Sequence, residues 1–151
     1  MLNTNQKDGN KMKKIITMSV YDCVKYVLDD TEIEPYVIIS IQDSQNGFGI
    51  MFNKTKYCKD VLTLYFDDME NEVPGLKLFT QEDAYKIINF VEQYNDISKI
   101  IVHCYAGQSR SASVAIAIAE KYKPDVLDFV NDSTPNQYVY KILSECFGDH
   151  E

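Results

Sequence analysis

Residues 36–41, YVIISI, constrain the fold more than any other segment of the sequence. The run is almost wholly apolar and rich in β-branched side chains, which favour strands. It does not alternate between apolar and polar residues, so both of its faces are expected to be covered, as in a parallel sheet with helices on either side. Three further short strands are predicted at 15–20, 61–66 and 99–103.

Helical patterns alternate with these strands. A short helix is predicted over 22–28, and a longer one follows Thr80, an N-cap candidate with Asp83 three residues further on. Residues 110–122 are apolar on nearly every side, which indicates a buried helix, and residues 136–147 predict a last amphipathic helix. Strands alternating with helices are typical of an α/β protein.

The chain length of 151 residues corresponds to one domain. We therefore expect a single α/β domain with a central, mostly parallel sheet of about four to five strands flanked by helices. The polar residues 1–12 predict a flexible N-terminal tail, and the domain is expected to occupy 13–151. Residues 42–60 predict a long connection of undetermined role.

Charge and composition exclude several classes of partner. The formal net charge is −8, whereas binding to nucleic acid depends on Lys and Arg that neutralise phosphates, so no nucleic-acid partner is expected. No apolar run approaches the roughly 18 residues of a membrane span, so we expect a cytoplasmic protein without a membrane partner. Neither the four cysteines nor the two histidines form a metal-binding pattern, so no metal and no cofactor are expected.

Residues 103–111, HCYAGQSRS, connect the strand at 99–103 to the buried helix at 110–122. Successive backbone N–H groups in such a glycine-containing turn, followed by a helix N-terminus, form a cradle for an anion such as phosphate. Arg110 closes the turn, and its planar guanidinium suits two parallel hydrogen bonds to phosphate oxygens. Cys104 opens it, surrounded by groups that favour the thiolate form. The segment therefore predicts a sulfur nucleophile aimed at a phosphorus atom.

The other residues of this segment have expected roles too. Ser111 is placed to donate a hydrogen bond to the Cys104 sulfur when that sulfur becomes a leaving group. His103 should point to the opposite face of the strand and order the loop. The residues expected to bind the substrate phosphate are Tyr105, Ala106, Gly107, Gln108, Ser109 and Arg110.

HCYAGQSRS resembles the Cys-x5-Arg-Ser/Thr signature of the cysteine-dependent protein tyrosine and dual-specificity phosphatases. Residues 64–68, LYFDD, resemble the strand and general-acid loop of the compact dual-specificity or bacterial branch. Residues 134–136, TPN, resemble its Pro-Asn segment, which implies a loop-ordering role for Asn136. The resemblance covers roughly residues 36–147 and implies the phosphotyrosine phosphatase-like fold.

The resemblance also implies a reaction. Asp68 takes the place of the general acid, with Asp67 as the alternative, and no metal is needed. The implied activity is hydrolysis of phosphotyrosine, and of phosphoserine or phosphothreonine, in a phosphorylated protein or peptide through a phospho-cysteine intermediate. Tyr105 and Gln108 are neutral where the phosphoinositide enzymes of this superfamily tend to carry basic residues, so phosphoinositides are disfavoured.

Two other functions remain open on sequence grounds. The cradle of residues 103–111 would also serve a phosphate- or phosphopeptide-binding module without turnover. A rhodanese-type sulfurtransferase likewise places a cysteine in a loop between strand and helix, but that loop is usually shorter and leaves Asp68 without a role.

Overall fold

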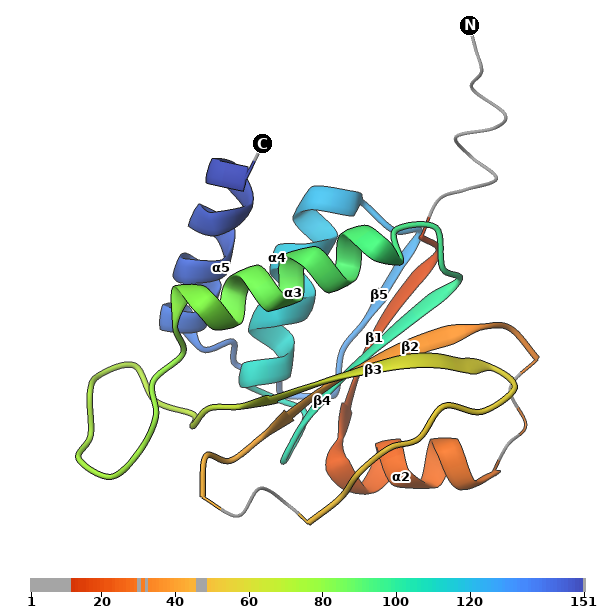
Figure 1. Cartoon of the computed structure of the whole chain (residues 1–151), viewed down its shortest axis with the longest axis horizontal. Coiled ribbons are helices and arrows are strands. Elements are labelled where there is room, and N and C mark those ends of the chain that lie inside the picture. The colour runs from red at the N-terminus through yellow and green to blue at the C-terminus, as the bar shows by residue number, and fades with distance from the viewer. Residues whose placement is uncertain (1–11, 30, 32, 46–48, 151) are drawn as a thin grey trace, which may run out of the picture.

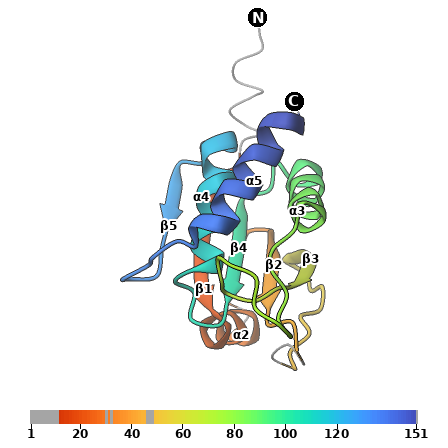
Figure 2. The ribbon, with the colours of Figure 1, turned by 90° about the vertical axis from the view of Figure 1, so that its left-hand side faces the viewer.

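A five-stranded sheet forms the centre of the molecule, in a computed structural model that describes residues 12–29, 31, 33–45 and 49–150. The strand order is β3-β2-β4-β1-β5 and every neighbouring pair is parallel, as Figure 2 shows. This confirms the predicted α/β class and parallel sheet. The strands are β1 (Lys14–Ser19), β2 (Tyr36–Gln42), β3 (Cys58–Tyr65), β4 (Lys99–Cys104) and β5 (Val126–Asp128).

Helices cover both faces of the sheet (Figure 1). Helix α2 (Val20–Asp29) lies on one face, and α3 (Gln81–Gln93), α4 (Arg110–Tyr122) and α5 (Gln137–His150) lie on the other. All seven residues of β2 are buried, which explains its unbroken apolar sequence. Within the described part of the chain, no helix has the length and apolarity needed to cross a membrane.

Helix α3 begins where its sequence predicts. The Thr80 side chain accepts a hydrogen bond from the Asp83 N–H, and the Asp83 carboxylate accepts one from the Thr80 N–H, both at 3.1 Å. This capping box satisfies two N–H groups that have no partner within the helix. The Asp83 carboxylate also accepts from Lys77 Nζ at 2.6 Å, which fixes the segment that leads into the helix.

Strand β5 is absent from the sequence prediction. It has only three residues, none of them buried, and it pairs with β1 at the edge of the sheet. Such a strand is too short for a periodic pattern. Strand β3 also begins earlier than predicted, at Cys58, so the connection from β2 to β3 is shorter than 42–60.

The predicted N-terminal tail falls mostly outside the described residues, which begin at Met12. Met12 is itself 1% exposed and belongs to the main core, so the prediction that it ends the tail is wrong. The chain is fixed immediately after it, because the N–H groups of Lys13 and Lys14 both donate to the Ser98 carbonyl, at 3.2 and 3.0 Å.

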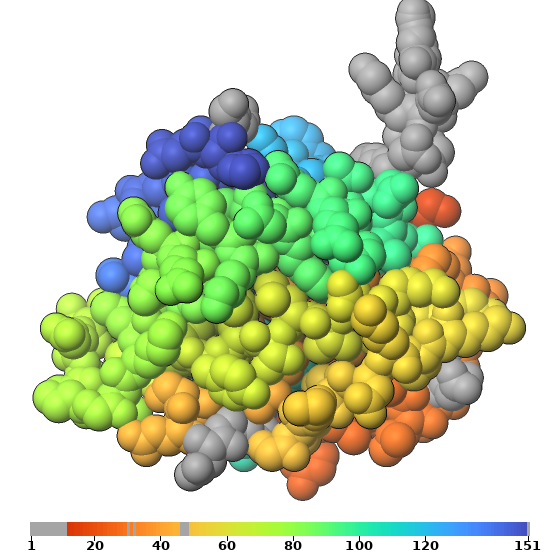
Figure 3. Space-filling view, in the orientation of Figure 1, coloured from red at the N-terminus to blue at the C-terminus, as the bar shows by residue number. Residues whose placement is uncertain are grey.

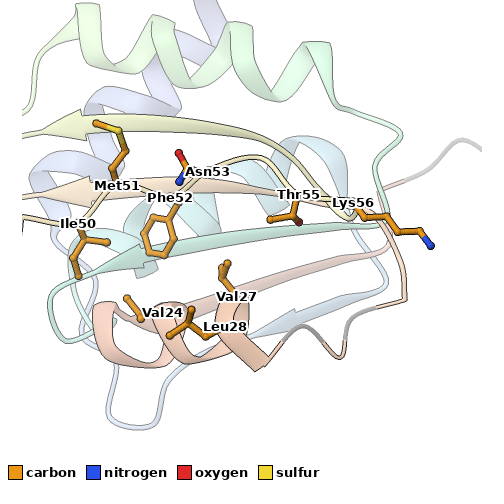
Figure 4. Close-up of a pocket in the computed structure, with 9 residues that line it drawn as sticks. All are labelled: Val24, Val27, Leu28, Ile50, Met51, Phe52, Asn53, Thr55 and Lys56. Atoms are coloured by element: carbon orange, nitrogen blue, oxygen red, sulfur yellow. The ribbon is translucent and has the colours of Figure 1, made fainter.

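Residues 50–56, in the connection from β2 to β3, lie beside α2 on the face of the sheet opposite α4 (Figure 4). A mainly apolar cavity of about 450 Å³ lies between them. Its described lining residues are Val24, Val27, Leu28, Ile50, Met51, Phe52, Asn53, Thr55 and Lys56. None of these belongs to 103–111, although the Phe52 ring contacts the His103 ring at 5.3 Å between centroids.

The carboxyl ends of β2, β3 and β4 meet at one edge of the sheet. Gln42 pairs with Tyr65, and Ser40 pairs with His103, so the segments that follow these strands leave the sheet together. The segment between β3 and α3 projects from this side of the molecule, in yellow-green at the left of Figure 3. In open α/β sheets ligands bind at this edge.

Candidate active site

The loop from Cys104 to Arg110 rests directly on the end of β1. Gly107 has a φ of +77°, and a Cβ atom built on it would lie 2.5 Å from the carbonyl carbon of Met18. Only glycine fits this turn without displacing the backbone of β1. The Val20 N–H donates to the Tyr105 carbonyl at 3.0 Å, which ties the loop to the start of α2.

The Cys104 sulfur lies at the base of this loop, where β4 ends, and the residue is 3% exposed. Its Sγ is 3.2 Å from Ser111 Oγ in the first turn of α4, and Ser111 is fully buried. A hydroxyl at this distance donates a hydrogen bond to a sulfur anion. The distance allows the hydrogen bond that the sequence predicts between Ser111 and the Cys104 sulfur.

The Arg110 guanidinium is buried and fixed along one edge. Its Nη1 donates to the Phe66 carbonyl at 2.8 Å and to the Asp43 carboxylate at 2.9 Å. Its Nε, in contrast, is buried and has no hydrogen-bond partner. A buried N–H without a partner is costly, and an oxyanion in the cradle would satisfy it.

His103 lies on the other face of β4 and is completely buried. Its Nδ1 is 3.1 Å from the Cys104 carbonyl, which only accepts hydrogen bonds, so Nδ1 carries the proton and donates. Its Nε2 accepts from the Ser40 hydroxyl at 2.6 Å. Burial lowers the pKa of His103 to about 4, so the ring is neutral and donates to the first peptide of the loop.

Asp68 reaches the loop from the segment after β3. Its Oδ1 accepts hydrogen bonds from Ser109 Oγ and from Asn136 Nδ2, each at 2.9 Å. Asn136 also donates to the Met69 carbonyl at 3.1 Å, and its own Oδ1 accepts from the Val139 N–H at the start of α5. Asn136 therefore connects the segment that carries Asp68 and Met69 to the start of α5.

Asp67 has a different environment. It is 8% exposed, and its carboxylate accepts hydrogen bonds from the Lys77 N–H at 2.7 Å, from the Ser44 N–H at 3.1 Å and from the Ser44 hydroxyl. Burial opposes ionisation, but these hydrogen bonds outweigh it and hold the pKa of Asp67 below its usual value. Asp67 thus acts as an anchor between the loops that carry Ser44 and Lys77.

The remaining loop residues differ in their contacts. The Gln108 side chain donates to the Asn131 carbonyl at 3.0 Å, and the backbone carbonyl of Gln108 accepts from the Thr134 N–H at 2.8 Å. Tyr105 is 62% exposed, and Ala106 is also exposed. Gln108 therefore connects the loop to the segment before α5. The sequence analysis did not predict this contact.

Three residues near the site were missed by the sequence analysis: Asp43, Ser40 and Ser44. Asp43 pairs with Arg110, Ser40 with His103 and Ser44 with Asp67. A signal existed for two of them, because Ser40 is the one polar residue in YVIISI and Asp43 is the first charge after that strand. No group of three or more His, Cys, Asp or Glu side chains that could hold a metal ion occurs among the described residues.

The fold of this chain is similar to that of solved phosphatase structures. Among solved structures, PTPMT1 in complex with PI(5)P is 18% identical in sequence, covers 90% of this chain and 91% of its own, and aligns with a TM-score of 0.51. A second structure of PTPMT1 is 16% identical over 89% and 90%, with a TM-score of 0.53. Tk-PTP in the active form is 16% identical over 88% and 92%, with a TM-score of 0.46.

No family model matches the sequence, and no curated protein matches it at a significant level. The likeness to PTPMT1 is therefore one of fold.

Proposed function

We propose that this chain is a metal-independent phosphomonoester hydrolase that dephosphorylates phosphotyrosine, and phosphoserine or phosphothreonine as well, in proteins. The partner is a phosphorylated protein or peptide, with no role for nucleic acid or a membrane. The reaction proceeds through a phospho-cysteine intermediate on Cys104, in two displacements at phosphorus.

Arg110 carries the proposal. Its guanidinium is 4% exposed and fixed through Nη1, while the buried Nε has no partner. The ion pair with Asp43 is made through Nη1. A phosphate dianion above Cys104 would accept a hydrogen bond from the orphaned Nε donor.

In the first displacement the Cys104 thiolate attacks the phosphorus while the backbone N–H groups of the loop and Arg110 hold the phosphate oxygens. The bond between phosphorus and the ester oxygen breaks. Asp68 gives its proton to that oxygen, which leaves as an alcohol or phenol. Proton transfer of this kind contributes about 10² to 10⁴-fold to the rate.

In the second displacement a water molecule attacks the phospho-cysteine. Asp68, now a carboxylate, accepts a proton from that water, and the bond between sulfur and phosphorus breaks. The sulfur leaves as a thiolate that the Ser111 hydroxyl, 3.2 Å away, stabilises with a hydrogen bond. Inorganic phosphate is released and the enzyme returns to its starting protonation state.

The test is hydrolysis of p-nitrophenyl phosphate with a chelator present. We expect turnover by the wild type, none by Cys104→Ser, and retained binding of phosphate or vanadate by that variant. Cys146→Ser, which makes the same change at a buried thiol of the main core, is the matched control and should keep its activity. Turnover by Cys104→Ser would contradict the proposal, and phosphopeptide binding without hydrolysis by the wild type would indicate a binding module instead.

A further inference from the structure

A second cavity, of about 390 Å³, adjoins the candidate active site, and we call it the flank cavity. It shares Asp68 and Ser109 with the site. Three segments, each following a strand, form its walls. The described lining residues are Asp68, Met69, Glu70, Gln108, Ser109, Asp132, Thr134, Pro135 and Asn136.

The walls of the flank cavity are held in place by hydrogen bonds. Gln108 fastens the segment before α5 at both ends, through the Asn131 carbonyl at 3.0 Å and the Thr134 N–H at 2.8 Å. Asn136 fastens the opposite wall through Asp68 and the Met69 carbonyl. The cavity is therefore a formed feature of the site, with few degrees of freedom left to lose when a ligand binds.

The position of Asp68 connects the flank cavity to the substrate, an argument that rests on the proposed function. The general acid must contact the ester oxygen, within about 3 Å. The part of the substrate bonded to that oxygen then lies next to Asp68, and Asp68 lines the flank cavity. Chemical groups close to the phosphorylated residue consequently reach this cavity.

The charge of the flank cavity is of one sign. Glu70 and Asp132 contribute carboxylates beside the proton-donating Asp68, and none of the described lining residues is Lys, Arg or His. Glu70 and Asp132 are exposed. The Arg110 guanidinium is turned to Asp43, and Lys77 is paired with Asp83 at 2.6 Å, so neither neutralises the cavity. A pocket lined by one sign of charge attracts ligands of the opposite sign.

We propose that the flank cavity binds a Lys or Arg side chain beside the phosphorylated residue, so that the preferred substrate is a phosphopeptide with a basic flank. Glu70 and Asp132 determine this specificity. The hydrogen bonds of Cys104, Arg110 and Asp68 involve neither Glu70 nor Asp132, so these two residues take no part in the chemical step. The same carboxylates repel substrates whose phosphate sits next to other anionic groups.

The test compares three phosphotyrosine peptides that differ only beside the phosphotyrosine, where they carry Arg, Ala or Glu. At low ionic strength we expect kcat/KM for the Arg peptide to exceed that for the Glu peptide by about tenfold, and high salt to reduce the difference. In the Glu70→Gln/Asp132→Asn double variant the ratio should fall towards one. Asn tolerates the positive φ of 63° at position 132, so this change preserves the turn.

The matched control is Glu82→Gln/Glu145→Gln, which removes two exposed carboxylates outside the flank cavity and should keep the wild-type ratio. Hydrolysis of p-nitrophenyl phosphate, which has no flank, should be equal in all three proteins. A ratio near one in the wild type, or a ratio unchanged in the double variant, would overturn the inference and leave the proposed function standing. Faster turnover of PI(5)P than of the Arg peptide would contradict both the inference and the protein substrate of the proposed function. Failure of the wild type to hydrolyse p-nitrophenyl phosphate would overturn the proposed function, and the inference with it.

Discussion

Asp67 and Asp68 are adjacent in the chain, yet the two carboxylates have opposite surroundings. Asp67 is buried and accepts three hydrogen bonds, whereas Asp68 is exposed and uses a single oxygen, Oδ1, to accept from Ser109 and Asn136. The second Asp68 oxygen takes no part in these two hydrogen bonds, which suits the proposed role of Asp68 as the general acid. Sequence proximity could not separate the two residues, because the distinction arises from Ser44 and Lys77, which lie in other loops.

Asp68→Asn should impair catalysis without changing the fold. Because an alkoxide leaves poorly without a proton, we expect kcat to fall about 10² to 10⁴-fold for an alkyl phosphate and distinctly less for p-nitrophenyl phosphate. Steady-state kinetics on the two substrates would measure this difference. An equal loss on both substrates would argue against Asp68 as the acid.

Asp67→Asn should impair stability first. The amide replaces one acceptor oxygen of Asp67 with an NH2 donor, which then faces the N–H groups of Ser44 and Lys77. We therefore expect the free energy of unfolding to fall by about 1 to 3 kcal/mol. Urea titration would measure this loss. Any decrease in turnover should be the same for alkyl and aryl phosphates. A selective loss on alkyl phosphates would instead transfer the acid role to Asp67.

At the scale of elements, the unit of β4, the loop and α4 is the part of the site that local sequence predicts best. The predicted start of α4 at Arg110 is confirmed, as is the capping of α3 by Thr80, because both signals lie within a few residues of the element they begin. Strand β5 and the Asp43 contact to Arg110 could not be predicted in this way. Each depends on a partner that is distant in the sequence.

Gly107→Ala tests how closely this unit packs against β1. The added Cβ would lie 2.5 to 2.6 Å from backbone atoms of Met18 and Ser19, at a φ that alanine rarely adopts. We expect a loss of about 2 to 4 kcal/mol in the free energy of unfolding, together with loss of turnover as the cradle is displaced. Thermal denaturation and hydrolysis of p-nitrophenyl phosphate would measure the two effects.

Gly148→Ala is the matched control for this substitution. Gly148 lies inside α5 with nothing within 4 Å of its Cβ position, so alanine there should stabilise the protein by about 0.5 to 1 kcal/mol and leave turnover unchanged. A neutral outcome for Gly107→Ala would show that the loop can move away from β1.

At the scale of the whole molecule, the sheet separates two environments that both act on the loop. The face covered by α3, α4 and α5 holds the main core and the Cys104 thiol, and the face covered by α2 holds the smaller core and the buried His103 ring. His103 is thus the link between the α2 face and the cradle, through its hydrogen bond to the Cys104 carbonyl. Folding itself keeps this ring uncharged.

The stability of the molecule should therefore depend on pH through His103. Its pKa is about 4 in the folded protein and about 6.5 in an unfolded chain, so the unfolded state binds more protons between these values. The stabilisation is complete above pH 6.5 and is lost as the pH falls towards 4, by about 3 kcal/mol in all. Urea titrations at pH 7, 6 and 5 would measure this slope. In His103→Gln the free energy of unfolding should depend less steeply on pH than in the wild type. The control is His150→Gln, which removes the surface imidazole and should keep the wild-type slope. Identical slopes for His103→Gln and the wild type would show that His103 does not cause the dependence.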